Sequence, residues 1–596
     1  MARLRLVLAA LLALFAVLTL LDRFVLVELL LRRIAIPFLF ATVVAFACIG
    51  IGALARRAKR IDAPIDLLIG YPIFGTLCFL IGTVKVNLWT MGAAVLACMA
   101  IGALKGWSTR SAAFQSAGPP ASSRQNPASP MPERQDAGGP ADWKPALRSH
   151  NVAMFIVLGV FACAFVAAQA PPSSLDELAY HLAVPHTWVL EGRAIALPLL
   201  SHSWFPLGIE SADLPSLTIL GSLDGGLASH FLHLFAAIAT TLLIARRSQS
   251  WLATAAIITT PALAVTAGWS LVDWPLAGLF VVLFMADDDE TASAATAAGL
   301  LTKFTFLPFA LLVWGWKRRL PKPIALLGLV FFARNLILAG NPVAPFFSGD
   351  TPHFIGYRAL ELSGYVFDGT FVDEALGASV LALPVLATSG LALVSLAIAF
   401  ALFFLAPSSR ILLPFLIVPA VDAAPALRRR AVAVVAWIAI VLQTFIVVWL
   451  TATSGAFTLL AGTASEPQFL RKARPSYAAI EWLNQTLPVT SRTLVVGFGE
   501  TYWFARPVRG GGNFDGGRIS RYLDVPTPEA LRARFKADGI THVAVVAVAP
   551  PTNEERKVEE RQNALSPTSQ RMLAITLDRY ASHVTSRGEA TLFTLR

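Results

Sequence analysis

The sequence predicts a polytopic α-helical membrane protein with about 14 transmembrane helices and a small soluble α/β domain at the C-terminal end. Three observations predict this fold class. The chain is 56% hydrophobic and only 14% charged, whereas a soluble domain carries roughly 25% charged residues. Apolar runs long enough to cross a bilayer recur along most of the chain. From about residue 465 onward, the pattern changes to short apolar strands and amphipathic helices.

Residues 1–104 are expected to form an N-terminal membrane region of four helices. The first apolar run has the basic start of a signal sequence, but no small-residue cleavage site follows, so we expect an uncleaved helix. The four cysteines all lie inside apolar runs and are expected to be small core residues rather than disulfide or metal ligands. The spans expected here are 4–21, 34–54, 65–84 and 88–104.

A stretch rich in Pro, Ser, Gly and Gln, residues 105–148, follows and is typical of a disordered cytoplasmic linker. Residues 149–464 are expected to form the transmembrane core. This core includes a large outer loop at 171–225. The expected spans are 151–170, 226–245, 251–268, 271–286, a divided pair at 294–316, 322–339, two within 377–406, 411–425 and 431–453.

The net charge of +11 does not indicate nucleic-acid binding, because the basic residues are scattered at the ends of apolar runs. Such residues mark cytoplasmic loops by the positive-inside rule. With ARRAKR (55–60) in the cytoplasm, ARRS (245–248) and LRRR (427–430) are cytoplasmic too, and WKRR (316–319) is cytoplasmic if the divided pair crosses the membrane twice. Arg32 and Arg33 fall on the wrong side. The expected location is the bacterial inner (plasma) membrane, with the outer loop and residues 465–596 extracytoplasmic.

The C-terminal segment, residues 465–596, is expected to be the small α/β domain. PSYAAIEWLNQTLP and TPEALRARFKADG predict helices, the second capped by Thr527, while RTLVVGFG and ITHVAVVAVA predict buried strands. The glycine-rich stretches VVGFGE (495–500) and RGGGNFDGG (509–517) lack the lysine and serine of a phosphate-binding P-loop, so we interpret them as turns.

With this topology, acidic and basic residues gather on the outer face. Asp176 and Glu177 begin the outer loop, Asp273 lies in a tight turn, and Lys303 lies between two short half-spans. Arg334 and Arg410 lie near the outer ends of their spans. Each one alone fits a capping or snorkelling residue, but ionisable groups at the edge of spans are functional candidates by default. Their convergence on one face favours a functional site.

Transfer from a lipid-linked donor suits such a site. A polyprenyl phosphate headgroup lies at the membrane surface, and cations stabilise the charge that develops on it as it leaves. A carboxylate at the interface can accept the proton of the attacking hydroxyl.

The sequence also resembles the GT-C glycosyltransferases, polytopic enzymes that include protein O-mannosyltransferases and the aminoarabinose transferases acting on lipid A. The resemblance covers about 150–596 and lies in the order of several short motifs rather than in any one of them. These are LDELAYHLAVPHTWVLEGR, FPLGIE, VDWPLAG, AGLLTKFTFLP, RNLILAGNPVAPFF, SSRILLP and PSYAAIEWLNQTLP. The four N-terminal spans and the linker lie outside it.

The resemblance implies roles for these residues. Asp176 corresponds to the proposed catalytic base or metal-linked carboxylate, with Glu177 beside it, and Asp273 to a second acid. Lys303 corresponds to a lysine near the donor phosphate. Arg334 and Arg410 match only loosely as further phosphate contacts. The resemblance also implies inversion at the anomeric carbon.

The histidines allow two interpretations. Glu177 and His181 are four residues apart and share a helix face, and imidazole and carboxylate groups can both bind a divalent metal. Alternatively, His181 and Tyr180 line an acceptor pocket or form hydrogen bonds within the loop. No cofactor is certain from the sequence, and a divalent metal is one option.

The sequence therefore predicts a membrane glycosyltransferase that transfers a sugar from a polyprenyl-phosphate donor to a hydroxyl of an extracytoplasmic lipid, glycan or protein. Membrane lipids are its other expected partners. Two alternatives remain: a transporter or flippase of lipid-linked sugars, and a non-catalytic membrane scaffold with an outer binding domain.

Overall fold

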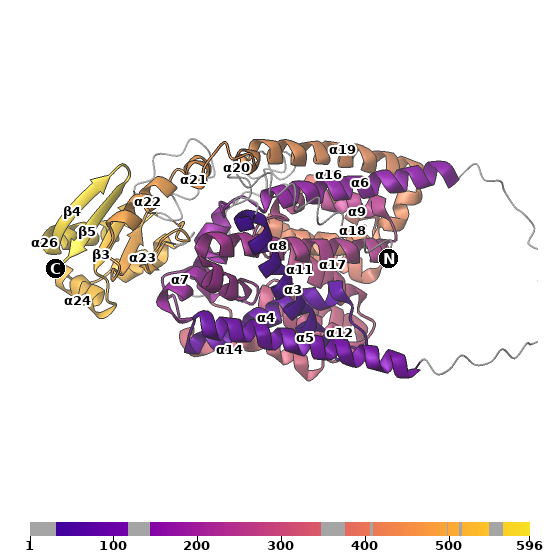
Figure 1. Ribbon diagram of the computed structural model, residues 1–596, viewed down its shortest axis with the longest axis horizontal. Coiled ribbons are helices and arrows are strands. Elements are labelled where there is room, and N and C mark those ends of the chain that lie inside the picture. Colours follow the sequence, from indigo (N-terminus) through magenta and orange to yellow (C-terminus); the bar gives the residue numbers. More distant parts are fainter. Residues whose placement is uncertain are drawn as a thin grey trace, which may run out of the picture.

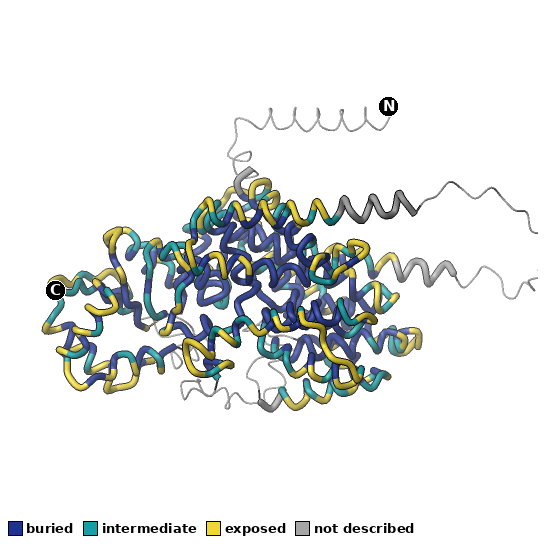
Figure 2. The backbone as a smooth tube through the Cα atoms, turned by 90° about the horizontal axis from the view of Figure 1, so that it is seen from below, coloured by how far each residue is buried: buried dark blue, intermediate teal, exposed yellow. Residues whose placement is uncertain are grey.

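The computed structural model describes residues 31–116, 143–346, 376–405, 409–497, 499–511, 515–546 and 564–596. These residues form an elongated helical body with a small β-sheet region at one end of its long axis (Figure 1). α5 ends and α6 begins at the opposite end of the body (Figure 1). Buried residues fill the interior of the helical body, and exposed residues lie along its outline (Figure 2).

Within the described residues, five helices are long and apolar enough to cross a membrane. Other apolar helices are shorter, with 10–17 residues, so about 14 crossings remain a prediction. The expected first span, 4–21, lies outside the described residues. The five long segments are Arg33–Ala55, Ala63–Val84, Leu88–Lys105, Glu210–Ser248 and Arg430–Thr453.

The N-terminal helices pack tightly because small residues line their contacts. A Cβ atom on Gly50 would lie 2.3 Å from the Cα atom of Gly102, and one on Gly70 would lie 1.8 Å from the carbonyl oxygen of Cys48. Cys48, Cys78 and Cys98 are buried among them, as expected for core residues. The elements here are η1 (Leu31–Ala35), α3 (Ile36–Ala55), α4 (Ala63–Val84) and α5 (Leu88–Ser116).

The expected linker, 105–148, is shorter in the structure than its composition suggests. α5 continues to Ser116, and α6 (Trp143–Ala167) begins before residue 148. The reason is local, because the helix-breaking prolines of this stretch begin only at Pro119. Residues 117–142 lie outside the described part of the chain.

The outer loop is mostly short helical turns, and it leads into a helix longer than the predicted span 226–245. That helix, α8 (Leu214–Ser248), is kinked at Gly221, whose φ of 83° is open to glycine. Before it come η2 (Glu177–His181), α7 (Ala183–Glu191), η3 (Ser201–Trp204) and η4 (Glu210–Asp213).

The rest of the body consists largely of short or broken helices. The predicted span 251–268 is divided into two helices at Pro261, and the divided pair around Lys303 is present as two short helices. The elements are α9 (Trp251–Ile258), α10 (Pro261–Thr266), α11 (Asp273–Met285), α12 (Asp289–Thr302), α13 (Phe306–Lys317), η5 (Pro323–Leu329), α14 (Val330–Ala339), α16 (Gly377–Ala382), η7 (Leu383–Leu386), α17 (Gly390–Leu405), α18 (Ser409–Asp422), η8 (Ala424–Arg428) and α19 (Arg430–Thr453).

The C-terminal region contains a five-stranded sheet in the order β2-β1-β3-β5-β4. β1 pairs in parallel with β2 and β3, whereas β5 pairs antiparallel with β3 and β4. The strands are β1 (Thr493–Val496), β2 (Val508–Arg509), β3 (His542–Val546), β4 (Ala581–Arg587) and β5 (Ala590–Leu595).

Helices cover both faces of this sheet, because successive strand residues point to opposite sides. Val495 packs with Leu483 of α22, while Leu494 packs with Phe535 of α24. Thr527 caps α24 as predicted, and its side chain accepts a hydrogen bond from the amide of Ala530. Part of the expected turn 509–517 is instead the start of α23. The helices are α20 (Ala456–Leu460), α21 (Glu466–Ala473), α22 (Tyr477–Thr486), α23 (Gly516–Leu523), α24 (Pro528–Ala537) and α26 (Pro567–Tyr580).

Arg33, which the positive-inside rule places on the wrong side, forms an ion pair with the C-terminal region. Its Nη2 atom lies 2.6 Å from Oε1 of Glu466 in α21, and Arg33 itself is buried. The buried guanidinium of Arg33 thus has a carboxylate partner in the C-terminal region.

Candidate active site

Asp176 lies in the first helical turn of the outer loop, and a capping box starts that turn. The hydroxyl of Ser174 accepts a hydrogen bond from the amide of Glu177, and the Glu177 carboxylate accepts one from the amide of Ser174. The sequence SLDE has the serine-to-glutamate spacing of this motif. The cap therefore fixes the start of the turn and with it the backbone of Asp176.

Arg410 joins Asp176 to Asp273. Its Nη1 atom lies 2.9 Å from Oδ2 of Asp176, and its Nη2 atom lies 3.3 Å from Oδ2 of Asp273. The Asp273 side chain is 1% exposed and the Arg410 side chain 7%, whereas that of Asp176 is 25% exposed. We call these three residues the acid–arginine cluster. Asp176 is its accessible member.

The three members of the cluster come from the ends of separate elements. Asp176 begins the outer loop, Asp273 begins α11, and Arg410 lies in the first turn of α18. The sequence predicts that all three lie at chain exits on one face. The structure brings them into direct contact.

Lys303 lies at the turn between α12 and α13, as predicted. It is half-buried, and among the described residues its ammonium has no ion pair within 4 Å. Its charge acts on the imidazole of His202, on which the charge of Asp176 also acts. Lys303 and Asp176 are therefore both close enough to His202 for their charges to act on it.

Aromatic rings lie between these charges. The rings of Tyr180 and His202 stack with centroids 4.1 Å apart, and Phe205 meets His202 edge to face at 5.0 Å. Burial lowers the pKa of His202 to about 4, although the charge of Asp176 opposes this shift. Burial also raises the pKa of Tyr180 well above its usual value. At neutral pH this wall is therefore uncharged.

His181 points to a buried carboxyl group. Its Nδ1 atom lies 2.9 Å from Oε1 of Glu210. Among the described residues, the buried His181 Nε2 and Glu210 Oε2 atoms have no hydrogen-bond partner. Burial and the nearby charges of Arg410 and Lys303 lower the pKa of His181 well below its usual value. A neutral His181 paired with Glu210 lies directly behind Tyr180.

Glu177, unlike Asp176, is fully buried, and its carboxylate accepts several hydrogen bonds. One oxygen, Oε1, lies 2.7 Å from Nε2 of His230 and 2.6 Å from the amide of Ser270. Burial raises the pKa of Glu177, but the His230 charge and these hydrogen bonds outweigh burial and lower it overall. Since Ser270 precedes Asp273 by one turn, Glu177 connects the two acid-bearing turns.

The side chain of Arg334 is held by the next residue in the chain, Asn335. Its guanidinium donates to Oδ1 of Asn335 at 2.8 Å and to the carbonyl of Phe205 at 3.2 Å, and it lies 5.0 Å above the Phe331 ring. Asn335 in turn donates to the carbonyl of Trp204 at 2.6 Å. Arg334 thus holds the loop beside His202, and its hydrogen bonds go to Asn335 and Phe205 rather than to the acid–arginine cluster.

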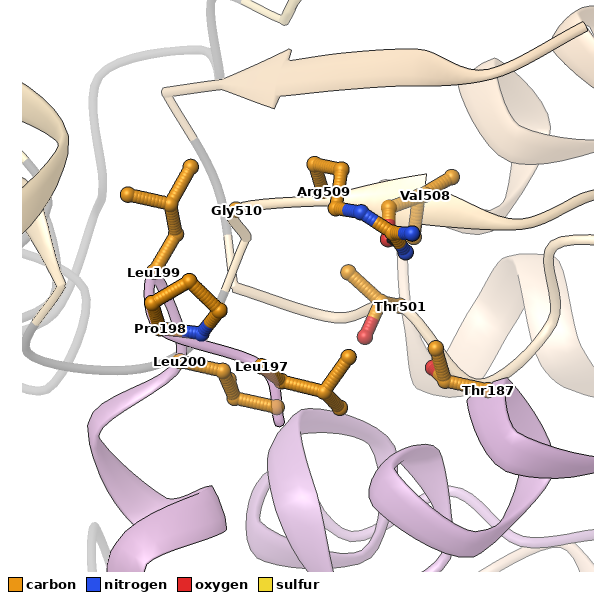
Figure 3. A pocket seen from close by; sticks show the side chains of 9 residues that line it. All are labelled: Thr187, Leu197, Pro198, Leu199, Leu200, Thr501, Val508, Arg509 and Gly510. Atoms are coloured by element: carbon orange, nitrogen blue, oxygen red, sulfur yellow. Dashed lines mark hydrogen bonds between the residues drawn. The ribbon is translucent and has the colours of Figure 1, made fainter. Parts of the chain in front are cut away.

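A small cavity lies elsewhere, between the outer loop and the end of β2 (Figure 3). There Leu197 and Leu199 face Val508 and Gly510, with Thr501 beside them. Its volume of about 20 Å³ is room for about one water molecule. A sugar does not fit, and none of the charged candidates lines this cavity.

Among the residues the structure describes, no three His, Cys, Asp or Glu side chains form a group that could hold a metal ion. Residues of the site that the sequence analysis did not single out are Glu210, His230 and Ser270. Two signals were available in the sequence: His230 lies within the apolar run LASHFLHLF, and Glu210 ends the motif FPLGIE. Neither signal predicts the partner of its side chain.

No protein-family model matches the chain, and a search of curated proteins found no match. Among solved structures, two of ArnT from Cupriavidus metallidurans match, one bound to undecaprenyl phosphate and one in the apo state. The chain is similar to ArnT, a GT-C transferase. Each match has 16% sequence identity and a TM-score of 0.43, and covers 76% of this chain and 98% of the ArnT chain. Similarity at this level does not determine an activity.

Proposed function

We propose that the protein is an integral membrane glycosyltransferase. It moves a sugar from a polyprenyl-phosphate donor to a hydroxyl of an extracytoplasmic acceptor, which is a lipid, a glycan or a protein. The observation that supports this most is the contact of Arg410 with both Asp176 and Asp273, beside Lys303. The proposed reaction requires an accessible carboxylate, here that of Asp176, and a cation that can bind phosphate, here that of Lys303.

In the proposed step, Asp176 is the general base. The acceptor hydroxyl attacks the anomeric carbon and forms the new glycosidic bond, while the bond from that carbon to the phosphate oxygen breaks. The hydroxyl proton passes to the Asp176 carboxylate, and the electron pair of the broken bond leaves with the polyprenyl phosphate. Arg410 orients Asp176 by one nitrogen and holds Asp273 by the other. Attack from the opposite side of the ring inverts the anomeric carbon.

Lys303 is the main proposed phosphate contact, because it has no ion pair among the described residues. Its ammonium neutralises the charge that develops on the leaving phosphate. Arg410 and Arg334 are further proposed phosphate contacts. Both already have protein partners: Arg410 pairs with two aspartates, and Arg334 donates to Asn335 and to the carbonyl of Phe205. Tyr180 and His181 form the proposed acceptor wall, with Asp273 as the second acid.

The proposed orientation places the acid–arginine cluster and the C-terminal region on the extracytoplasmic side. α8 begins near the site, and its last turn contains Arg246, which pairs with Asp62 at 2.9 Å. Arg56 and Arg60 lie on the chain next to Asp62. Basic residues at that end agree with a cytoplasmic face.

The test uses membranes from cells that make the full chain. Envelope glycans and glycolipids are analysed by mass spectrometry after deletion of the gene and after complementation with Asp176→Asn, or with Asp578→Asn, which changes an exposed carboxyl of α26. We expect one sugar linkage to be missing in the deletion and in Asp176→Asn, and to be restored by Asp578→Asn. Normal glycosylation with Asp176→Asn would reject the base, and an unchanged envelope in the deletion would reject the transferase.

A further inference from the structure

The turn that follows Asp176 is a π-helix rather than an α-helix. The amide of Leu182 donates to the carbonyl of Glu177 at 3.0 Å, five residues back, instead of to that of Leu178. The Leu178 carbonyl accepts hydrogen bonds from the amides of Thr501 at 2.8 Å and Tyr502 at 3.1 Å. The carbonyl of Leu178 thus accepts two amides of the C-terminal region, whereas in an α-helix it would accept the amide of Leu182.

The segment that supplies these amides is firmly held. Glu500 accepts a hydrogen bond from the hydroxyl of Ser476 at 2.6 Å. The Tyr502 side chain is fully buried, its hydroxyl donates to the carbonyl of Ser222, and its ring lies 5.1 Å from that of His186. Trp503 donates from its indole nitrogen to the carbonyl of Pro172 at 3.2 Å. The two amides therefore approach Leu178 from a fixed frame.

A single π-turn inserts one extra residue into a helix, which rotates the following residues by about 100° relative to an α-helix. Asp176 precedes the insertion and is anchored by the capping box, whereas Tyr180 and His181 lie within it. The π-turn therefore sets the direction of Tyr180 and His181 relative to Asp176. π-turns are frequent at functional sites.

We infer that the backbone amides of Thr501 and Tyr502 are positioning groups, which keep the turn after Asp176 in its π form and so align the acceptor wall with the base. The C-terminal region is then part of the active site, although none of its side chains takes part in the proposed step. This inference rests on the proposed function.

The test compares two substitutions at one position in the full-length protein. Thr501→Pro removes the amide hydrogen, while Thr501→Ala keeps it. We expect Thr501→Pro to lower kcat by about 10- to 100-fold through misalignment of the acceptor, with the KM for the polyprenyl-phosphate sugar unchanged. Thr501→Ala is expected to keep wild-type kcat. A kcat for Thr501→Pro equal to that of Thr501→Ala would overturn the inference.

Hydrogen exchange provides a readout that does not depend on turnover. In Thr501→Pro, we expect faster exchange of amides in 177–186, with exchange in α11 unchanged. A general loss of protection would mean unfolding, and insertion of one alanine between Ala179 and Tyr180 then replaces the variant. The insertion leaves the amides of Thr501 and Tyr502 unchanged but turns Tyr180 and His181 relative to Asp176, so kcat should fall while protection in α11 is kept. Retained kcat in the insertion variant contradicts the inference. If Asp176→Asn is fully active, the proposed function fails instead.

Discussion

The Oδ2 atom of Asp176 lies 2.9 Å from Nη1 of Arg410. This contact joins the first turn of the outer loop to the first turn of α18. The same guanidinium reaches Asp273 with its other terminal nitrogen. A planar group with two parallel donors can hold two carboxylates in a fixed geometry, which a single ammonium cannot do.

Replacing Arg410 by lysine tests this geometry. Arg410→Lys keeps the positive charge but replaces two nitrogens at fixed positions by one, so we expect sugar transfer to fall by about 10- to 100-fold. The matched control is Arg319→Lys, which changes an exposed arginine paired with Asp289 and should leave transfer unchanged. Equal transfer rates in the two variants would show that the bridge between the acids is dispensable.

The Glu177–His230 pair is expected to be energetically coupled. Both side chains are buried, and removing one partner leaves the other without its hydrogen bond. In a double-mutant cycle with Glu177→Ala and His230→Ala, we expect a coupling energy of about 1–3 kcal/mol. The measurement is the free energy of unfolding in detergent. A coupling energy near zero would mean that the 2.7 Å contact does not stabilise the fold.

Acid should destabilise the protein partly through His202. Its pKa is about 4 in the folded protein and 6.5 ordinarily, so the unfolded chain binds the proton more readily. Stability therefore falls as the pH drops from about 6.5 to 4, by about 3 kcal/mol in total for this group. His202→Phe keeps a ring for Tyr180 to stack on but cannot titrate. Unfolding midpoints at pH 7.5 and 4.5 should differ less in this variant than in wild type, and an equal difference would contradict the assignment.

The Arg33–Glu466 ion pair allows a charge-exchange test. Glu466→Arg places two cations together, and we expect destabilisation of about 1 kcal/mol, because Glu466 is one-third exposed and water screens the pair. The double variant Arg33→Glu, Glu466→Arg should restore most of the loss. If the double variant is no more stable than Glu466→Arg, the two residues do not interact in the folded protein.

The sequence predicts where the chain leaves the helical body, because hydropathy alone determines these points. Asp176, Asp273, Lys303 and Arg410 were singled out for that reason, and all four lie at element ends in the structure. Hydropathy does not predict which partner each of these side chains contacts. Asp176 and Glu177 are neighbours in sequence, yet one is partly exposed beside Arg410 and the other is buried against His230.

The π-turn and the break of the 251–268 span at Pro261 were also not predicted from the sequence. An insertion of one residue leaves the apolar pattern around 177–181 almost unchanged, and the hydrogen bonds that stabilise it come from Thr501 and Tyr502, far along the chain. Likewise, the roles of His230 and Ser270 depend on how α8 and the turn before α11 pack together. Such contacts are properties of the tertiary fold.

The length of α12 has a consequence for the medium in which the proposed reaction takes place. Its 14 residues rise about 21 Å, whereas the hydrocarbon core of a bilayer is about 30 Å thick. α12 starts among the charged residues Asp287–Glu290, so a chain that enters there reaches Lys303 before it has crossed the whole core. The leaving phosphate would then be drawn below the headgroup level, where water is scarce. Scarcity of water protects an activated sugar from hydrolysis and leaves the acceptor hydroxyl as the available nucleophile.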